Sequence, residues 1–470
     1  MLKRNNWMKE ISARSLAVYS KNSSENSRNV FHRDYGMIVH SNFFKRLAKK
    51  TQVYTLPEND HVRSRLTHSI EVSQIGRQLA RQLAYQLKNH GFLTGDIYWS
   101  FLVKFEELTA SACLAHDIGH APFGHSGAKI LGESLTRKYG LLDGFDDNKQ
   151  VVHILLNEFF YEGIDPTACL VAATLKKPEL EKNCYSTDKF KLKSLMNELG
   201  LENVRHPAGI LMEAADDIAY ICSDLEDYVD YFIQFSNHQV LNVLAEMLEA
   251  LPILDSNYQE TRESWIKLIT KMNGLASTDS DSNAEQKDKL VEQFRNNLMK
   301  SMIMHVFDGI KSVVSKIEDI NELPDAFEQF IDEKGIKKCD KPKRKADLNL
   351  LYWNDRRNKA GQIYYDVKRT CYDEFILKQD KVVEQDLLAN NVIGEMTDAL
   401  KPLSESGFDK QYEFKFLSQS MRHHVSFAHR NPELIDPRRA VANYIAGMSD
   451  RYCIDALSKI RPINARGRAA

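Results

Sequence analysis

Apolar residues recur every three or four positions along several long stretches of this chain, and only an α-helix turns that spacing into one continuous apolar face. The clearest stretch begins at Thr67, where THSIEVSQIGRQLARQLAYQL places Ile75, Leu79 and Leu83 on one side. Glycine and proline, which interrupt regular structure, number only 21 and 12 among 470 residues. The pattern therefore predicts an all-α chain with at most short β segments.

Other segments show the same period and are expected to be helical. They are FEELTASACLAHDIG (105–119), LMEAADDIAYICSDLEDYVDYF (211–232, with Ile218, Cys222 and Leu225 as its apolar stripe), and the stretches marked by Phe294, Leu298, Met302 and Val306 and by Leu388, Val392, Met396 and Leu400. TQVYTL (51–56) favours a short strand or an extended segment. Two polar stretches, 273–289 and the lysine-rich 332–345, are expected to be surface loops.

The bulk composition excludes several classes of protein. The net charge is −2, so no overall basic field points to a nucleic-acid binder. The 7 cysteines form no CxxC pair, which is typical of free thiols in a reducing compartment. No apolar run reaches the roughly 18 residues needed to cross a membrane, and the first residues do not resemble a signal peptide. We therefore expect a soluble cytoplasmic protein without a membrane partner.

A candidate metal site combines three separated segments. His116 and Asp117 are adjacent, and imidazole and carboxylate are both good ligands for Mn, Fe, Ni or Mg. His68 lies at an expected helix start, and Asp216 lies in an otherwise apolar helical stretch where burial of an acid requires a partner. The three segments can bring these four residues to one point and leave coordination positions open for water and phosphate oxygens.

Four more polar residues accompany this set. His120 follows His116 by four positions, on the same face of the expected helix, and His125 lies beyond a Pro-Phe-Gly turn. A histidine beside a metal-bound water can act as general acid or base, although each could instead be structural. Tyr220 and Asp224 continue the side of the helix that carries the last metal ligand, where they can pack against a sugar and accept a bond from a 3′-hydroxyl; a solvated acidic face is the alternative.

Four blocks of the sequence resemble the HD-domain deoxyguanosine triphosphate triphosphohydrolases and their deoxynucleotidase relatives. The blocks are FHRDYGMIVHSNFFKRLAKKTQVYTLPENDHVRSRLTHSIEV (31–72), LAHDIGHAPFGHSG (114–127), EAADDIAYICSDLED (213–227) and PRRAVANYIAGMSDRY (437–452). Their order and spacing match the family over nearly the whole chain, which is far more specific than one His-Asp pair.

The resemblance implies a helical fold, with residues 1–272 as the HD-domain phosphohydrolase core and 273–470 as a helical region that completes the nucleotide site and makes oligomer contacts. It implies hydrolysis of a deoxynucleoside triphosphate, dGTP above all, to deoxynucleoside and inorganic triphosphate. It also implies assembly into oligomers, commonly hexamers, and in some members a response to nucleotides or single-stranded DNA at a separate site.

The resemblance also assigns residues. His68, His116, Asp117 and Asp216 carry over as metal ligands. The substrate contacts are Gln52 and Tyr220 to the deoxyribose, Asp224 to its 3′-hydroxyl, and Arg65 and Lys176 to the phosphates.

Two positions depart from the family pattern. Many members have a glutamate three residues after the histidine that matches His125, and this chain has Ala128 there. Others have a catalytic histidine where this chain has Asp147, in FDDNKQ. Both changes leave open which group assists the attacking water. The alternatives are another HD-type nucleotide phosphohydrolase, such as a phosphodiesterase or 5′-monophosphatase, or a binding regulator with this fold and little catalysis.

Overall fold

The regular secondary structure of the described residues is helical. The computed structural model describes residues 7, 29–53, 62–157, 164–232, 263, 266–267, 270, 284–336, 349–355, 360–369, 380–410, 415 and 417–467. Within these ranges, β pairing is limited to one antiparallel bridge between Thr51 and Ser64. The predicted all-α class is therefore confirmed.

The chain folds into two compact units, each assembled from separate stretches. Unit one comprises residues 1–70, 111–205 and 380–470, and unit two comprises 71–110 and 206–379. Two of the four boundaries fall within α4 (Arg65–Asn89) and α5 (Gly95–Ala115), and the other two lie just before the helices that begin at Pro207 and Asp380. The linear division at residue 272 expected from the sequence stays a prediction.

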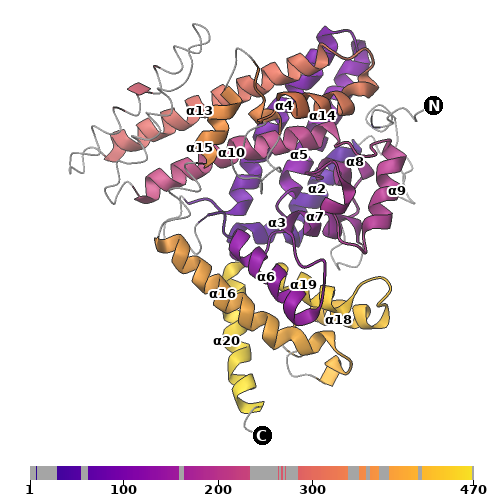
Figure 1. The fold of residues 1–470 in the computed structure, drawn as a ribbon, viewed down its shortest axis with the longest axis vertical. Helices are drawn as coiled ribbons and strands as arrows, with labels where there is room; N and C mark the ends of the chain where they lie inside the picture. The colour runs from indigo at the N-terminus through magenta and orange to yellow at the C-terminus, as the bar shows by residue number, and fades with distance from the viewer. Residues whose placement is uncertain are drawn as a thin grey trace. The chain divides into compact units, whose positions relative to one another are not determined.

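Unit one is built from short and medium helices of both halves of the chain (Figure 1). They are α2 (Val30–His40), α3 (Asn42–Arg46), η1 (Leu47–Lys49), α6 (Gly124–Tyr139), α7 (Asp147–Leu156), α8 (Ala168–Ala173), η2 (Leu180–Lys182), α9 (Lys189–Leu199), α16 (Asp380–Leu400), η9 (Lys401–Ser404), η10 (Phe408–Lys410), α18 (Gln419–Arg430), α19 (Pro437–Ala446) and α20 (Asp450–Gly467).

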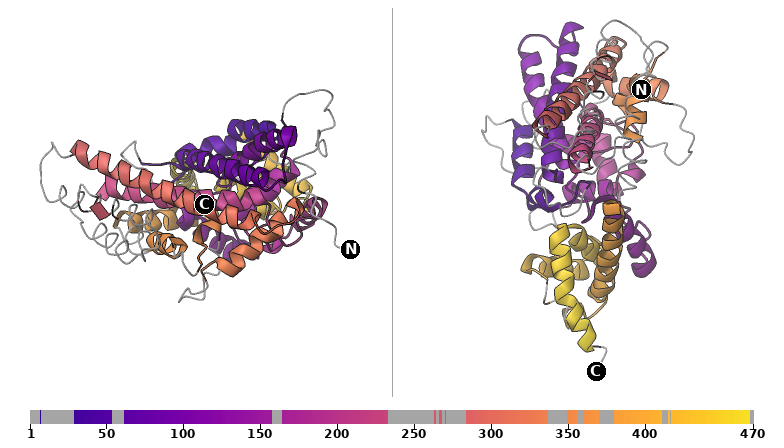
Figure 2. Two further views of the ribbon diagram at one scale, coloured as in Figure 1. Left: turned by 90° about the horizontal axis from the view of Figure 1, so that it is seen from above. Right: turned by 90° about the vertical axis from the view of Figure 1, so that its left-hand side faces the viewer.

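An apolar core joins α6 to the C-terminal helices of unit one. Helix α16 runs beside α6 (Figure 1) and beside α20 (Figure 2). Each buried leucine-sized side chain contributes about 1.5–3 kcal/mol. Ala121 and Phe123, which precede α6, belong to the same core, so the segment between α5 and α6 is packed against C-terminal residues. The core includes Leu131, Leu135, Val392, Ile393, Met396, Leu400, Val441, Ile445 and Cys453.

Unit two is organised by two long helices, α10 and α13, that lie side by side (Figure 1). The apolar stripe predicted for α13 is buried, since Phe294, Leu298, Met302 and Val306 are all at most 4% exposed. Besides parts of α4 and α5, the described elements of unit two are α10 (Pro207–Phe232), α13 (Ala284–Val314), η5 (Ile320–Glu322), α14 (Leu323–Lys334), η6 (Leu350–Tyr352) and α15 (Ala360–Arg369).

Several local predictions need correction. Leu388 is 36% exposed, because it lies on α16 before the part of the helix that packs in the core. The expected loops at 273–289 and 332–345 are partly helical, since α13 begins at Ala284 and α14 continues to Lys334. Residues 273–283 and 337–345 lie outside the described ranges, as do 54–56 of the expected extended segment.

Two further expectations concern membranes and thiols. Of the helices that the structure describes, none is both long and apolar enough to span a bilayer. The described cysteines are buried free thiols: Cys113, Cys169, Cys184, Cys222 and Cys453.

A buried acid in unit one gives a pH-dependent test of this fold. Asp34 of α2 accepts hydrogen bonds from Thr167 N (3.2 Å) and Thr167 Oγ1 (2.5 Å), and burial raises its pKa from 3.8 to about 7. Folding therefore takes up a proton between these values, and stability falls as pH rises through that window. We expect the free energy of unfolding to fall relative to Asp34→Asn by up to about 1.4 kcal/mol per pH unit there.

The measurement is chemical denaturation of both proteins at several pH values between 4 and 8. Asp165→Asn is the control, because Asp165 is a nearby but exposed acid. A difference between the parent protein and Asp34→Asn that stays constant with pH would contradict the prediction.

Candidate metal centre

The sequence pair His116-Asp117 lies in a turn, not on a helix. Helix α5 ends at Ala115, so the prediction that it continues to Gly119, with His116 and His120 on one helical face, was wrong. The reason is packing with another segment. A Cβ atom on Gly119 would lie 2.5 Å from the backbone of Asp147, so the chain turns where it approaches α7.

His116 has the orientation of a metal ligand. Its Nδ1 donates a hydrogen bond to the carbonyl of Cys113 at 2.6 Å, which leaves Nε2 without a proton in the neutral ring. Nε2 lies 3.2 Å from Asp117 Oδ1, and the ring centroid lies 5.6 Å from that of His68. Both histidines are buried, at 1–2% exposure. Two buried acceptors that face each other require a cation or a proton between them, so these residues fit a divalent ion.

A buried ion pair joins the start of α4 to this turn. Arg65 Nη1 lies 2.9 Å from Asp117 Oδ2, and both side chains are buried. Burial alone would raise the pKa of Asp117, but His116, His120 and Arg65 hold it well below its usual range. Asp117 is therefore an anion across the neutral pH range.

Buried polar atoms without protein partners lie in the same region. No hydrogen-bond partner among the described residues reaches Arg65 Nε, Arg65 Nη2 or Gln52 Oε1. A Cβ atom on Gly124 would lie 3.3 Å from Arg65 Nη2 and 3.9 Å from the Gln52 carbonyl, which places all three residues at one turn. Buried donors and acceptors of this kind are normally satisfied, so the arrangement suits an oxygen-rich ligand.

A second cluster contains His120, His125 and Asp147. His120 Nδ1 lies 3.1 Å from Asp117 Oδ1, and its Nε2 lies 3.6 Å from Asp147 Oδ2. His125 Nδ1 lies 3.9 Å from the same carboxylate oxygen, and its side chain is 67% exposed. Burial lowers the pKa of His120 to about 3 and raises that of Asp147 to about 7. The spacing of these ligand atoms would also admit an ion.

Asp147 is the residue whose place in the site the sequence did not reveal. Ala128, where relatives have an acid, is buried in the core of unit one. The carboxylate beside His125 comes from Asp147 instead, at the start of α7, where Ala121 N donates to its Oδ1 at 3.1 Å. The sequence did contain a signal: an acid, Asp147, is present in a chain that lacks the expected acid at position 128. The family pattern by itself indicates only the loss of a histidine at position 147.

Helix α10 of unit two carries the remaining predicted acids and the tyrosine. Asp217, the second acid of the Asp-Asp pair, accepts bonds from Asn349 Nδ2 and from Lys368 Nζ at 2.6 Å, so it has a structural role. This agrees with the assignment of the ligand role to its neighbour. The metal role of Asp216 and the sugar contacts of Tyr220 and the buried Asp224 stay predictions.

Lys176, the other predicted phosphate ligand, lies half-buried in the loop after α8, and its phosphate role stays a prediction.

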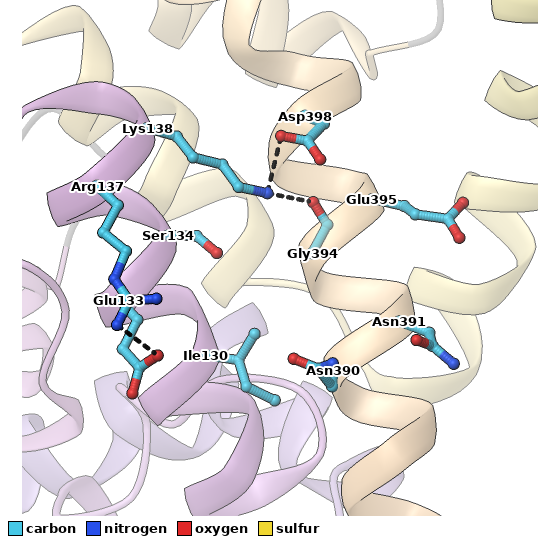
Figure 3. A pocket seen from close by; sticks show the side chains of 10 residues that line it. All are labelled: Ile130, Glu133, Ser134, Arg137, Lys138, Asn390, Asn391, Gly394, Glu395 and Asp398. Carbon is cyan, nitrogen blue, oxygen red and sulfur yellow. Dashed lines mark hydrogen bonds and ion pairs between the residues drawn. The ribbon is translucent and has the colours of Figure 1, made fainter.

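A hollow of about 340 Å³ between α6 and α16 is lined by charged and amide side chains (Figure 3). Its charges are satisfied locally, since Lys138 Nζ lies 2.8 Å from Asp398 Oδ1 and Arg137 pairs with Glu133. This hollow therefore differs from the site around Arg65 and Gln52, where buried donors and acceptors bond to none of the described residues.

Comparison with known families places two domains on the chain. A model described as the HD domain matches residues 65–218, and a model described as the phosphohydrolase-associated domain matches residues 366–459. The first match spans His68, His116, Asp117 and Asp216.

Curated relatives carry the name deoxyguanosinetriphosphate triphosphohydrolase-like protein. The one from Pseudomonas aeruginosa (strain LESB58) is 31% identical over 50% of this chain and 60% of its own length. That from Wolinella succinogenes is 33% identical over 47% of this chain and 55% of its own length. These alignments thus span little more than half of the relatives. That from Rickettsia bellii (strain RML369-C) is 26% identical over 93% of each chain.

The close approach of the metal-site turn to α7 can be tested with two glycines. In Gly119→Ala the new methyl group would meet backbone atoms of Asp147 and Val151 at 2.5 Å, so one segment must move. We expect the free energy of unfolding to fall by about 1–3 kcal/mol. In Gly394→Ala, within α16, the methyl group meets nothing within 4 Å, and we expect a gain of about 0.5–1 kcal/mol.

Urea unfolding of both variants checks this pair. Equal stability changes in Gly119→Ala and Gly394→Ala would contradict the observed packing.

Proposed function

We propose that this chain, which carries an HD domain and a phosphohydrolase-associated domain, is a metal-dependent deoxynucleoside triphosphate triphosphohydrolase. The products would be a deoxynucleoside and inorganic triphosphate. The observation that supports this most is the buried Arg65 guanidinium, which is paired with Asp117 on one side and has donors on the other that bond to none of the described residues. Such a group suits the oxygens of a bound phosphate.

We assign the metal to His68, His116, Asp117 and Asp216. Two imidazole nitrogens and two carboxylates suit Mn, Mg, Fe or Ni. A divalent ion bound there would neutralise phosphate charge and polarise the phosphorus–oxygen bonds. The Cys113 carbonyl supports the set by fixing the tautomer of His116.

The phosphates would be held by cationic side chains of unit one. Arg65 presents Nε and Nη2 to the chain of phosphates, and Lys176 would contribute a second positive charge. Attack of water on the α-phosphorus breaks its bond to the 5′-oxygen, so the deoxynucleoside departs and the α-phosphorus stays in the inorganic triphosphate. Negative charge builds up on the phosphate oxygens in this step, so fixed cations here stabilise the transition state more than the bound substrate.

Proton transfer would fall to the second cluster. The water that attacks the α-phosphorus must lose a proton and the 5′-oxygen of the departing deoxynucleoside must gain one, and His125 or His120 would carry this transfer. Burial lowers the pKa of His120 to about 3, which makes it a weak base at neutral pH, so we place the transfer on His125 first. Asp147, whose carboxylate lies between the two rings, would orient them and balance the positive charge that forms. Asp147 would therefore take the place of the acid that the family has three residues after the histidine matching His125.

The sugar would be read by three side chains. Tyr220 would pack against the deoxyribose where a 2′-hydroxyl would clash, Asp224 would accept a bond from the 3′-hydroxyl, and Gln52 Oε1 would accept a further bond. The preference for dGTP rests on the names of the relatives. We further propose a cytoplasmic homo-oligomer, a hexamer, with nucleotides or single-stranded DNA as effectors.

Product analysis is the first test of this function. We expect the protein, with Mn or Mg, to convert dGTP to deoxyguanosine and tripolyphosphate, and to act on GTP at least about tenfold more slowly. Each of the other deoxynucleoside triphosphates should be assayed alone and in the presence of the other three. Pyrophosphate and a monophosphate among the products would indicate a different nucleotide hydrolase on the same site.

The metal ligands provide the second test. We expect His116→Ala and Asp216→Ala to lose at least about 100-fold in kcat and to lose bound metal, because a half-filled site cannot retain the ion. Asp217→Asn is the matched control, since that neighbouring acid bonds to Asn349 and Lys368. Near-normal hydrolysis by His116→Ala and Asp216→Ala at saturating Mn or Mg would refute the proposed site.

A further inference from the structure

The side-chain carboxylate of Asp450, in the C-terminal region, accepts hydrogen bonds from two separate segments of the site. Asp450, the first residue of α20, is 2% exposed. Its Oδ2 accepts hydrogen bonds from Thr51 N at 2.9 Å and from Thr51 Oγ1, and its Oδ1 accepts one from Phe123 N at 2.8 Å. Thr51 precedes Gln52, and Phe123 lies between the two histidines of the second cluster. One carboxylate therefore ties the sugar side of the site to the acid–base side.

A buried lysine makes the complementary connection. Lys50, 3% exposed, donates from Nζ to the carbonyl of Ala446 at 2.7 Å and to the carbonyl of His120. Burial lowers the pKa of Lys50 to about 7, and the negative charge of Asp450 opposes that shift. The backbone carbonyl of Lys50 also accepts a bond from Arg65 N at 3.3 Å. The lysine thus connects the end of α19 to the first residue of the second cluster.

The turn held by these bonds has an unfavourable backbone. Phe123 has φ +62° and Gly124 has φ +59°, and a side chain such as that of phenylalanine rarely adopts the left-handed region. A Cβ atom on Gly127 would lie 1.8 Å from the Pro122 carbonyl, so the turn is also tightly closed. A conformation of this kind persists only where surrounding contacts determine it.

We propose that Asp450 and Lys50 are positioning residues of the active site, through which the C-terminal region fixes the turn from His120 to Gly124 against the segment that bears Gln52. This inference rests on the proposed function for its kinetic consequence. Its structural consequence, restraint of the two segments, can be measured without any substrate. The phosphohydrolase-associated domain thereby acquires a role in catalysis beyond burial of the core.

The central variant is Asp450→Asn, which keeps size and one acceptor but turns the other oxygen into a donor that faces an N–H group. One of the two segments must then lose its bond. We expect kcat for dGTP to fall about 10- to 100-fold, as for other small misplacements of catalytic groups, with the metal content unchanged. Amide hydrogen exchange should rise in peptides that cover 50–53 and 120–124 and stay unchanged elsewhere in unit one.

Asp455→Asn is the matched control, because this acid lies on the same helix with its side chain 48% exposed. It should leave kcat, KM and exchange unchanged. Thr51→Val is the milder variant, since it removes only the hydroxyl bond to Asp450. We expect it to raise KM about 3- to 10-fold, through Gln52, with little change in kcat and in the melting temperature.

Several outcomes decide the proposal. Values of kcat and KM for Asp450→Asn within about twofold of the parent protein would overturn it, as would exchange that rises uniformly over unit one. If Asp450→Asn does not fold, an unchanged KM in Thr51→Val overturns the proposal and a raised KM supports it. If the parent protein hydrolyses no deoxynucleotide, the proposed function fails. The exchange measurement then decides alone whether the restraint exists.

Discussion

The ion pair between Arg65 and Asp117 is the interaction on which the rest of the candidate site depends. Both charges are removed from water, which is costly unless each has a close partner with good geometry. The pair fixes the first turn of α4, and so His68, relative to the turn that carries His116. It also leaves Arg65 Nε and Nη2, to which no described residue bonds, as buried donors beside the same turn.

The turn from His116 to Gly127 has a shape that dictates its glycines. Gly119 and Gly127 lie where a methyl group would meet backbone atoms, and Gly124 has a positive φ. These positions explain why LAHDIGHAPFGHSG contains three glycines in a chain that is otherwise poor in them. The turn brings the metal-site pair, the second cluster and Asp147 within a few side-chain lengths of one another.

The helices were predictable because their signals are local: apolar residues on one face indicated α4, α10 and α13. The metal roles of His68, His116 and Asp117, which rest on the spacing of the motif blocks, stay predictions. The end of α5 was not predictable, because Ile118 continues the apolar pattern and only contact with α7 ends the helix. The same limit applies to the bonds of Asp450, since Thr51 and Phe123 lie 399 and 327 residues away in the sequence.

These long-range bonds give a physical reason why an HD domain and a phosphohydrolase-associated domain occur in one chain. Acid–base groups must be held within about 0.5 Å of a productive position, and a turn with a left-handed phenylalanine cannot hold itself to that precision. The C-terminal helices supply both means of restraint, since they form the apolar core around Phe123 and the carboxylate that accepts its N–H. The HD motif carries the proposed ligands, and a residue more than 300 positions later accepts a hydrogen bond from the N–H of Phe123 in its turn.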